Sequence, residues 1–282
     1  MSARGRRPEE GRGRADLHVH TRASDGTATV AEVLAAAVAA GLHVVAITDH
    51  ERIDAALAAR QMARDEGLPL EVVVGEEVTT RGGHLLALFV GTRIRPWRSL
   101  RATVIAVHEA GGLAIPAHPF APYPLCAQEG AVRRLLEDPD PAARPDALEV
   151  FNPTILGRAG GGRPASFARA VGLAAVAGSD AHAAEAIGQA VTLFPGRSAG
   201  DLRRAIVGGQ TEVDGRFHDP GSQLLVFGRQ LRKYGRDLRD ELARLWGLGP
   251  GRDVGYPRRA IPAASGREGD RDEALGPTSH RR

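Results

Sequence analysis

The chain is poor in three features that each define a class of protein. It has a single cysteine, Cys126, a single lysine, Lys233, and no long apolar run. One cysteine excludes an internal disulfide and suits a reducing cytoplasm. No stretch approaches the roughly 20 apolar residues that span a bilayer, and no apolar segment follows the basic N-terminus. We therefore expect a cytoplasmic protein with no membrane anchor, no secretory signal and no disulfide partner.

The two ends of the chain differ from its middle in composition. Both are rich in glycine, proline and charge and poor in apolar residues, which is typical of disordered segments. We predict a disordered basic tail at 1–14, a folded domain at 15–215, a C-terminal helical extension at 216–248 and a disordered tail at 249–282.

Short apolar segments alternate with amphipathic helical patterns through the middle of the chain. The predicted strands include 43–48, 70–74, 84–90, 113–116, 147–151, 173–177 and 190–194, and the predicted helices include 55–66, 97–110, 163–171 and 199–207. A capping box at Thr29 and Glu32 opens a further helix that ends at Gly41. This alternation predicts an α/β fold with a parallel sheet covered by helices.

Polar residues stand where these strands end. His18 and His20 alternate with Leu17 and Val19, so both imidazoles share one face of a strand. Five further polar residues follow predicted strands: His50, Glu77, His118, Asp180 and His182. Loops at the carboxyl ends of barrel strands converge on one mouth, and burying so many polar groups there is costly unless they share a partner. Imidazoles mixed with carboxylates favour zinc, manganese or iron.

The order of these motifs resembles that of the PHP (polymerase and histidinol phosphatase) superfamily, in particular its stand-alone metal-dependent phosphoesterases. The resemblance is carried by His18-Val19-His20, Ser24-Asp25-Gly26, Thr48-Asp49-His50, Gly75-Glu76-Glu77, His84, Ala117-His118-Pro119 and Gly178-Ser179-Asp180-Ala181-His182. It implies a distorted (βα)7 TIM-like barrel with two or three divalent metal ions (Mn, Zn or Fe) at its C-terminal mouth.

The resemblance also implies a set of metal ligands, position by position: His18, His20, Asp25, His50, Glu77, His84, His118, Asp180 and His182. His18, His20 and Asp180 are expected to share one ion with Glu77. Glu77 would bridge to a second ion held with His84 and His118, and Asp25, His50 and His182 would hold a third. Glu76 competes with Glu77 for the bridging position, and the family pattern favours Glu77.

The implied reaction is attack of metal-bound hydroxide on phosphate esters of small nucleotides or short oligonucleotides. His20 or His182 could assist proton transfer. Arg22 and Arg158 are the arginines best placed to bind a phosphate, and Asn152 is a candidate hydrogen-bond donor to the substrate. The expected partner is a small phosphorylated substrate, and the oligomeric state is left open.

Three other functions fit part of the pattern. An amidohydrolase-like C–N hydrolase also uses His-x-His, but many such enzymes bridge their metals with a lysine, and Lys233 lies far from every motif. A histidinol-phosphate phosphatase and a non-catalytic, metal-stabilised module are the remaining alternatives. Phosphate release from a nucleotide panel separates these functions from the leading one.

Four other features have plain structural explanations. Asp16 and Asp49 either orient neighbouring imidazoles or cap strand ends. The run 160–162 is glycine without the Lys-Ser/Thr of a phosphate loop, so a flexible loop is expected. Cys126 lies in a proline-rich loop with no base beside it in the sequence, which argues against a catalytic thiol.

Overall fold

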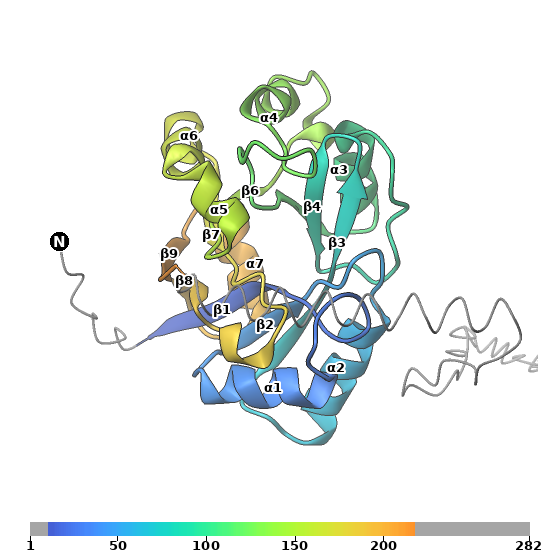
Figure 1. Ribbon diagram of the computed structural model, residues 1–282, viewed down its shortest axis with the longest axis vertical. Coiled ribbons are helices and arrows are strands. Elements are labelled where there is room, and N and C mark those ends of the chain that lie inside the picture. The colour runs from blue at the N-terminus through green and yellow to red at the C-terminus, as the bar shows by residue number, and fades with distance from the viewer. Residues whose placement is uncertain (1–10, 218–282) are drawn as a thin grey trace, which may run out of the picture.

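The computed structural model describes residues 11–217, which form a mixed α/β fold (Figure 1). Its strands are β1 (Arg12–Val19), β2 (Val44–Ile47), β3 (Glu71–Thr80), β4 (Gly83–Leu88), β5 (Leu113–Pro116), β6 (Ala147–Phe151), β7 (Ala174–Ala177), β8 (Ala190–Pro195) and β9 (Glu212–Gly215). The predicted tail at 249–282 and all but the first two residues of the predicted extension at 216–248 lie outside the described residues.

Two sheets make up the strand layer. One is seven-stranded, in the order β5-β4-β3-β2-β1-β8-β9, and the other pairs β6 with β7. β6 lies against β5, and β7 lies against β8 and β9, so the strands curl around a common interior. The expected α/β class is confirmed, but the prediction of a parallel sheet is wrong for several pairs. β4 runs antiparallel to both β3 and β5, and β8 runs antiparallel to both β1 and β9.

The antiparallel pair β3–β4 has a local cause. Only Arg81 and Gly82 separate the two strands, and Thr80 pairs with Gly83 across the turn. Parallel strands need a crossover of a dozen or more residues, so a two-residue link can only form a hairpin. The sequence prediction placed a strand at 70–74 and stopped it there, whereas β3 continues through Glu77 to Thr80.

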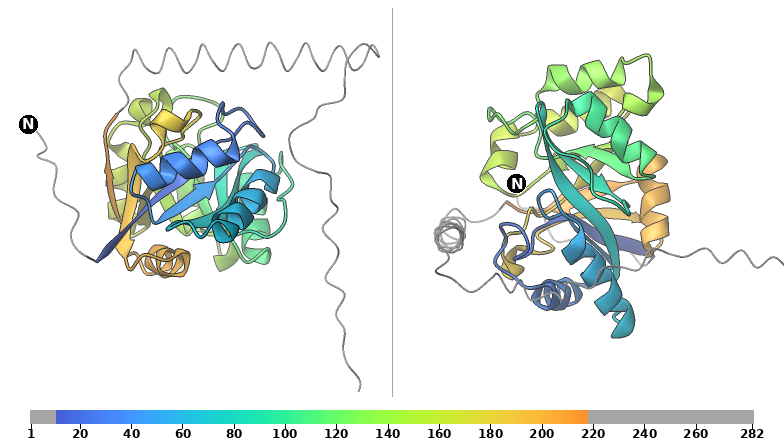
Figure 2. Two further views of the ribbon diagram at one scale, coloured as in Figure 1. Left: turned by 90° about the horizontal axis from the view of Figure 1, so that it is seen from below. Right: turned by 90° about the vertical axis from the view of Figure 1, so that its right-hand side faces the viewer.

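Helices cover the outside of the strands (Figures 1 and 2). They are α1 (Val30–Ala39), α2 (Asp54–Asp65), α3 (Leu100–Glu109), α4 (Glu129–Leu136), α5 (Ile155–Gly160), α6 (Arg163–Val171) and α7 (Ala199–Val207), with 3-10 turns at Pro141–Ala143 and Ala184–Ala186. The predicted capping box is present on α1: Thr29 accepts from the backbone of Glu32, and the Glu32 carboxylate accepts from the Thr29 amide.

The buried apolar side chains form two clusters. Leu17, Leu86 and Ile115, from three different strands, are fully buried together inside the curled sheet. A larger cluster lies between the strands and the helices and includes Val33 of α1 and Val104 of α3. Alternation along the strands therefore fills both faces, and it leaves the carboxyl ends of the strands for polar residues.

Some predicted boundaries are wrong. β1 begins at Arg12, so the predicted tail at 1–14 ends at least three residues too late, because Arg12–Ala15 pairs with β8. The predicted helix 97–110 begins only at Leu100, where Ser99 caps it. Helix α5 and strand β9 were not predicted. Among residues 11–217, no helix has the length and apolarity needed to cross a bilayer.

Candidate metal centre

Strand β1 brings two imidazoles to the mouth of the curled sheet. His18 and His20 are almost fully buried, at 0% and 1% exposed, and their ring centroids lie 5.1 Å apart. The backbone around them is fixed: Asp16 accepts from the amides of His18 and Ser179, and Ala181 O accepts from the His20 amide. The predicted placement of both rings on one face is confirmed, and Asp16 makes the strand-end contacts of a cap.

Glu77 lies at the centre of the imidazoles. Its Oε2 lies 3.2 Å from Nε2 of both His18 and His20. Its Oε1 lies 2.8 Å from Nδ1 of His84 and 3.0 Å from Nε2 of His118. The two oxygens of one buried carboxylate therefore face two different pairs of imidazoles, which is the arrangement of a bridging ligand.

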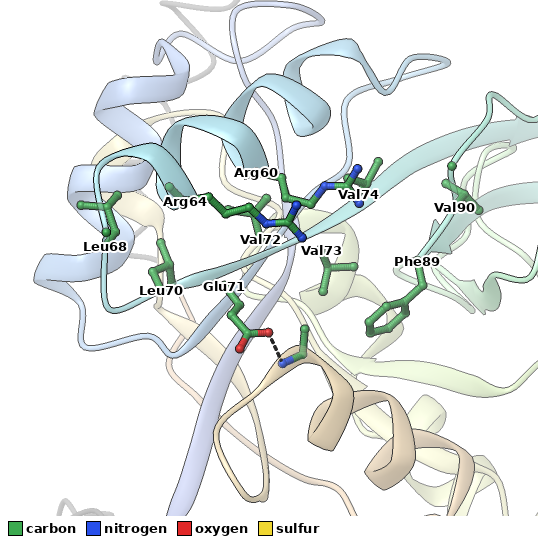
Figure 3. Close-up of a pocket in the computed structure, with 14 residues that line it drawn as sticks. Arg60, Arg64, Leu68, Leu70, Glu71, Val72, Val73, Val74, Phe89 and Val90 are labelled. Carbon is green, nitrogen blue, oxygen red and sulfur yellow. Dashed lines mark hydrogen bonds between the residues drawn. The ribbon is translucent and has the colours of Figure 1, made fainter. Parts of the chain in front are cut away.

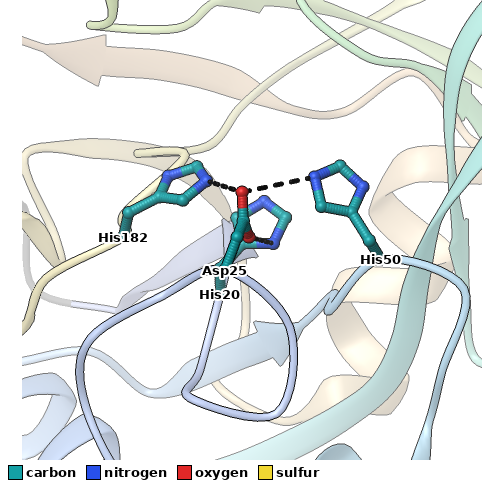
Figure 4. A group of neighbouring side chains, drawn as sticks. All are labelled: His20, Asp25, His50 and His182. Atoms are coloured by element: carbon teal, nitrogen blue, oxygen red, sulfur yellow. Dashed lines mark hydrogen bonds and ion pairs between the residues drawn. The ribbon is translucent and has the colours of Figure 1, made fainter. Parts of the chain in front are cut away.

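A second carboxylate gathers the outer part of the site (Figure 4). Asp25 Oδ2 lies 2.9 Å from His182 Nε2 and 3.7 Å from His50 Nε2, and Asp25 Oδ1 lies 3.5 Å from His20 Nδ1. The loop that carries Asp25 is held by Asp49, which accepts from the Thr21 amide and hydroxyl at 2.8 and 2.7 Å. Asp49 thus fixes the loop that carries Asp25, and within residues 11–217 its side chain contacts Thr21 and Ser24 rather than an imidazole.

Asp180 joins the two halves of the cluster. Its Oδ1 lies 3.5 Å from His18 Nε2, 3.4 Å from His20 Nε2 and 3.5 Å from His182 Nδ1. Asp180 and His118 both have positive backbone φ angles, 49° and 29°. Such strain in residues other than glycine is typical of functional sites, where surrounding contacts hold it in place.

Glu149, which the sequence prediction missed, supports three parts of the centre. Its Oε1 lies 3.0 Å from His18 Nδ1, and its Oε2 accepts from the His118 amide at 2.5 Å and from Asn152 Nδ2 at 3.2 Å. Asn152 also donates to Asp180 at 3.3 Å. A buried acid within the apolar strand 147–151 was the signal in the sequence that could have identified it.

The His118 ring has a thiol neighbour. Cys126 Sγ lies 3.3 Å from His118 Nδ1, so the expectation that no base lies beside Cys126 is wrong. The loop that follows β5 returns Cys126 to this ring, a contact that spacing along the chain does not reveal. Cys126 is 2% exposed. Its thiol contacts Nδ1 of His118, while Nε2 of the same ring faces Glu77, so the thiol orients the imidazole.

The charges of the cluster shift its proton equilibria in opposite directions. Burial lowers the pKa of His18, but the carboxylates of Asp180 and Glu77 outweigh it and raise the pKa well above its usual value. Burial also lowers the pKa of His20, but the carboxylates of Asp25, Asp180 and Glu77 outweigh burial and raise this pKa to about 10. Burial raises the pKa of Glu77, but the surrounding imidazoles hold it well below its usual range.

The donor set fits divalent metal ions. Nitrogen and carboxylate atoms lie within 4.8 Å of one another in four overlapping groups: His20, Asp25, His50 and His182; His18, His20 and Asp180; His18, Glu77 and His118; and His50, Glu77 and His84. Both ring nitrogens of His20 and Nδ1 of His84 are buried without a hydrogen-bond partner among the described residues. Close approach without hydrogen bonding is expected of ligands that share an ion.

These groups bear on the predicted set and its division. All nine predicted ligands lie within one connected cluster. The groups contain the expected His18, His20 and Asp180 together and the expected Asp25, His50 and His182 together. His84 and His118 both lie near Oε1 of Glu77. They belong to separate groups, however: His118 is grouped with His18, and His84 is grouped with His50. Of the two adjacent glutamates, Glu77 lies in the cluster, whereas Glu76 accepts from the Ile94 amide.

The remaining predicted site residues lie around this cluster in different ways. Asn152 is 2% exposed, and its amide already donates to Glu149 and Asp180. The Arg158 guanidinium stacks on the ring of Phe217, with 4.7 Å between its central carbon and the ring centroid. Arg22 is exposed at the start of the loop that carries Asp25. Phosphate binding by the two arginines stays a prediction.

A separate groove of about 750 Å³ lies between α2 and the first residue of α7 (Figure 3). Its floor is Val72, Val73 and Val74 of β3, and it contains none of the nine candidate ligands. Glu71 crosses it to accept from the Ala199 amide at 2.8 Å. The groove therefore belongs to the opposite half of β3 from Glu77.

Comparisons with known proteins give a consistent result. A family model described as the PHP domain matches residues 16–113, and one described as PHP-associated matches residues 162–211. An uncharacterized protein of Methanocaldococcus jannaschii is 34% identical over 150 residues, which is 49% of this chain and 81% of that protein. A 5'-3' exoribonuclease Rnm of Salmonella typhimurium is 42% identical over 65 residues, but the match covers only 23% of this chain and 22% of the relative.

Two solved structures share the fold. One is a two-domain protein from Bacteroides vulgatus that contains a predicted PHP-like metal-dependent phosphoesterase, with a TM-score of 0.60 and 17% identity over 81% of this chain and 75% of that one. The other is PsfC from Pseudomonas syringae, with a TM-score of 0.58 and 20% identity over 79% of this chain and 99% of that one. At these identities the likeness concerns the fold.

Proposed function

The chain belongs to the PHP superfamily, and from that premise we propose that it hydrolyses phosphate esters of small nucleotides or short oligonucleotides. The observation that carries the proposal is the position of Glu77. One buried carboxylate presents its two oxygens to His18 and His20 on one side and to His84 and His118 on the other. Paired divalent ions about 3.5–4 Å apart are the usual catalyst for displacement at phosphorus, and a bridging carboxylate holds such a pair.

Two or three divalent ions in this set would supply an activated water and would neutralise charge on the phosphate. The protein's own groups have distinct tasks. His182 Nδ1 lies 2.9 Å from the backbone oxygen of Asp180, which keeps the proton on Nδ1 and leaves Nε2 to face Asp25. His18 and His118 are oriented in the same way by Glu149 and Cys126. These contacts fix the orientation of three candidate ligands.

The outer side of the cluster is more exposed to solvent than its inner side. The side chain of His50 is 25% exposed, whereas those of His18 and His20 are fully buried. A phosphate ester would approach past His50 and His182, which is the side on which Asp25 lies. Arg22 precedes the Asp25 loop, and we propose it as a phosphate contact there, with Arg158 as a second contact further out.

The substrate class is supported by the partial relatives. The exoribonucleases match over about a quarter of their length or less, so their activity is carried over only as a proposal. The charged ligand set agrees with a phosphodiester or phosphomonoester substrate. Residues 11–217, which contain all nine candidate ligands, include no lysine, and this disfavours a lysine-bridged amidohydrolase.

A phosphate-release screen tests this function. Purified full-length protein is supplied with Mn²⁺ and offered a 3',5'-bisphosphate, a cyclic nucleotide and a short oligonucleotide. We expect release of phosphate or nucleotide from at least one class, and loss of both activity and bound metal in His18→Ala and Asp180→Ala. His280→Ala is the control. Metal retention without hydrolysis of any ester would favour the non-catalytic alternative.

A further inference from the structure

An arginine-rich connection carries an exposed tryptophan beside the metal centre. The chain between β4 and α3, residues 89–99, includes Trp97, whose exposed fraction is 64%. Between Glu77 and Glu109 the sequence has five arginines and no acidic residue. Arg81 of the β3–β4 turn and Arg93, Arg95 and Arg98 of the connection are all exposed. We call these four arginines and Trp97 the Trp97 surface.

The backbone of the connection is hydrogen-bonded to β3 and to the β3–β4 turn. The Val90 amide donates to Val74 O at 3.2 Å, and the Trp97 amide donates to Thr79 O at 2.8 Å. At the far end, the Arg81 amide donates to Arg98 O at 2.9 Å. The Trp97 surface is therefore anchored to the strand that also carries Glu77.

Trp97 is held in an unfavourable conformation that burial does not explain. Its φ angle is 61°, in the left-handed region that bulky residues rarely adopt. Its amide is bound by Thr79, and its carbonyl accepts from Arg81 Nε at 3.0 Å. A strained backbone usually persists where the surrounding structure holds it for a functional reason. Here it displays a large aromatic ring to solvent.

The Trp97 surface adjoins the open side of the candidate metal centre. Thr79, which binds the Trp97 amide, lies two residues beyond Glu77 on β3, and its hydroxyl lies 3.5 Å from His84 Nε2. The Thr79 amide donates to Glu51, the residue after His50. His50 is the most exposed of the nine candidate ligands, so a chain leaving the centre past it meets the end of β3 at Thr79.

Among residues 11–217, none of the four arginines forms an ion pair with a carboxylate. Two neighbouring acids are bound to backbone amides instead: Glu51 accepts from Thr79, and Glu76 accepts from Ile94. Arg93 acts on Glu76 only at longer range, where it lowers the pKa of that carboxyl against the effect of burial. Exposed arginines around an exposed aromatic ring are the combination by which proteins bind single-stranded nucleic acid, because the phosphates pair with the cations and a base stacks on the ring.

We propose that the Trp97 surface binds the extended part of a single-stranded oligonucleotide whose end lies in the metal centre. The inference rests on the proposed phosphoesterase function and narrows it to substrates longer than a mononucleotide. A base would stack on Trp97, and neighbouring phosphates would contact the arginines. Contacts with this surface would then determine how much the affinity of the protein for an oligonucleotide increases with the length of that oligonucleotide.

Fluorescence anisotropy of the full-length protein tests the proposal. The probes are 3'-fluorescein-labelled single-stranded RNAs of 2 and 12 nucleotides with phosphorothioate linkages, which resist cleavage. We expect the wild-type protein to bind the 12-mer more tightly than the 2-mer. Trp97→Ala should weaken 12-mer binding about tenfold, and Trp97→Phe should restore most of it. Arg95→Ala and Arg98→Ala should each reduce the slope of log affinity against log salt by about 0.7.

Arg169→Ala is the matched control, because Arg169 is an exposed arginine on α6, outside the surface. Melting curves establish that each variant is folded. The proposal is overturned if the wild-type protein binds both lengths equally, if Trp97→Ala binds the 12-mer as tightly as the wild type does, or if Arg169→Ala weakens binding as much as Arg98→Ala. Because binding is measured without turnover, this result is independent of whether any phosphate ester is hydrolysed.

Discussion

Glu149 Oε1 lies 3.0 Å from Nδ1 of His18, and both side chains are fully enclosed by the protein. This contact places the proton of the imidazole on Nδ1 and leaves Nε2 facing Glu77. The other oxygen of Glu149 holds the amide of His118. One carboxylate outside the nine candidate ligands therefore orients a ligand on each side of Glu77.

Glu149→Gln is the first test of this arrangement. The substitution keeps the shape of the side chain but removes the charge that favours the Nδ1–H form of His18. We expect metal affinity and activity to fall about 10- to 100-fold, the usual effect of losing a partner of a metal-bound histidine. Glu109→Gln, on the exposed end of α3, is the control. Unchanged metal affinity in Glu149→Gln would refute the positioning role.

Gly178→Ala tests the packing behind His18. A Cβ at residue 178 would lie 2.4 Å from the Cβ of His18 and 3.0 Å from Oε1 of Glu149, so either the strand or the imidazole must move. We expect bound metal and activity to fall at least tenfold. Gly162→Ala is the matched control, because nothing lies within 4 Å of the corresponding position. Metal content by plasma emission spectroscopy provides the readout, and equal content in both variants would contradict the prediction.

Metal affinity should depend on pH in a defined direction. Carboxylates outweigh burial and raise the pKa of His18 well above its usual value and that of His20 to about 10. The contact with Cys126, together with Glu77 and Asp180, raises the pKa of His118 well above its usual value despite burial. These rings therefore hold protons at neutral pH in the metal-free protein and must release them to bind an ion. Affinity should rise from pH 6 to pH 8.

Titration calorimetry with Mn²⁺ in two buffers of different ionisation enthalpy measures the protons released. The imidazoles are the expected source, because the pKa of Glu77 and that of Asp180 are held well below their usual values and both groups are already ionised. An affinity that is independent of pH, with no proton release, would show that these rings are neutral before metal binds.

His108 provides a pH test outside the metal centre. Its Nε2 lies 2.9 Å from Asp146 Oδ2, and its Nδ1 lies 2.7 Å from the carbonyl oxygen of Ala142, so both nitrogens have acceptors. The hydrogen bond with Asp146 raises the pKa of His108 despite its partial burial. A raised pKa contributes stability that is fully present below about pH 6.5 and is lost as the pH rises through the folded-state value.

We therefore expect His108→Gln to lower the melting temperature more at pH 6 than at pH 9. Melting curves of the wild type and the variant at the two pH values check this. His43→Gln is a control, because burial lowers the pKa of His43 and its contribution has the opposite pH dependence. An equal loss for His108→Gln at both pH values would contradict the assignment.

The sequence was sufficient to predict the cluster but not its support. Several candidate ligands follow strand ends, which a sheet brings together whatever lies between them. The full set, including Asp25 and His84, was implied by the resemblance to the PHP superfamily. Glu149 sits inside the apolar strand 147–151 and was read as part of that strand. The contact of Cys126 with His118 depends on the path of a loop, which no periodicity records.

The strand directions and the start of α3 were mispredicted for local reasons. The two-residue turn at Arg81-Gly82 makes β4 antiparallel, although apolar alternation along the strand fits either direction. Trp97 and the residues after it have a helical pattern, but Ser99 caps α3 and Trp97 is held outside the helix by Thr79. The tertiary contact with Thr79 of β3 therefore overrode the local pattern.

The most direct test of the metal centre is anomalous X-ray diffraction at the manganese edge from crystals of the protein grown with Mn²⁺. The account predicts at least two peaks about 3.5–4 Å apart, both within bonding distance of the Glu77 carboxylate, with one contacting His18 and His20 and the other contacting His84 or His118. Crystals in which manganese is bound elsewhere, with no peak within bonding distance of Glu77, would contradict it.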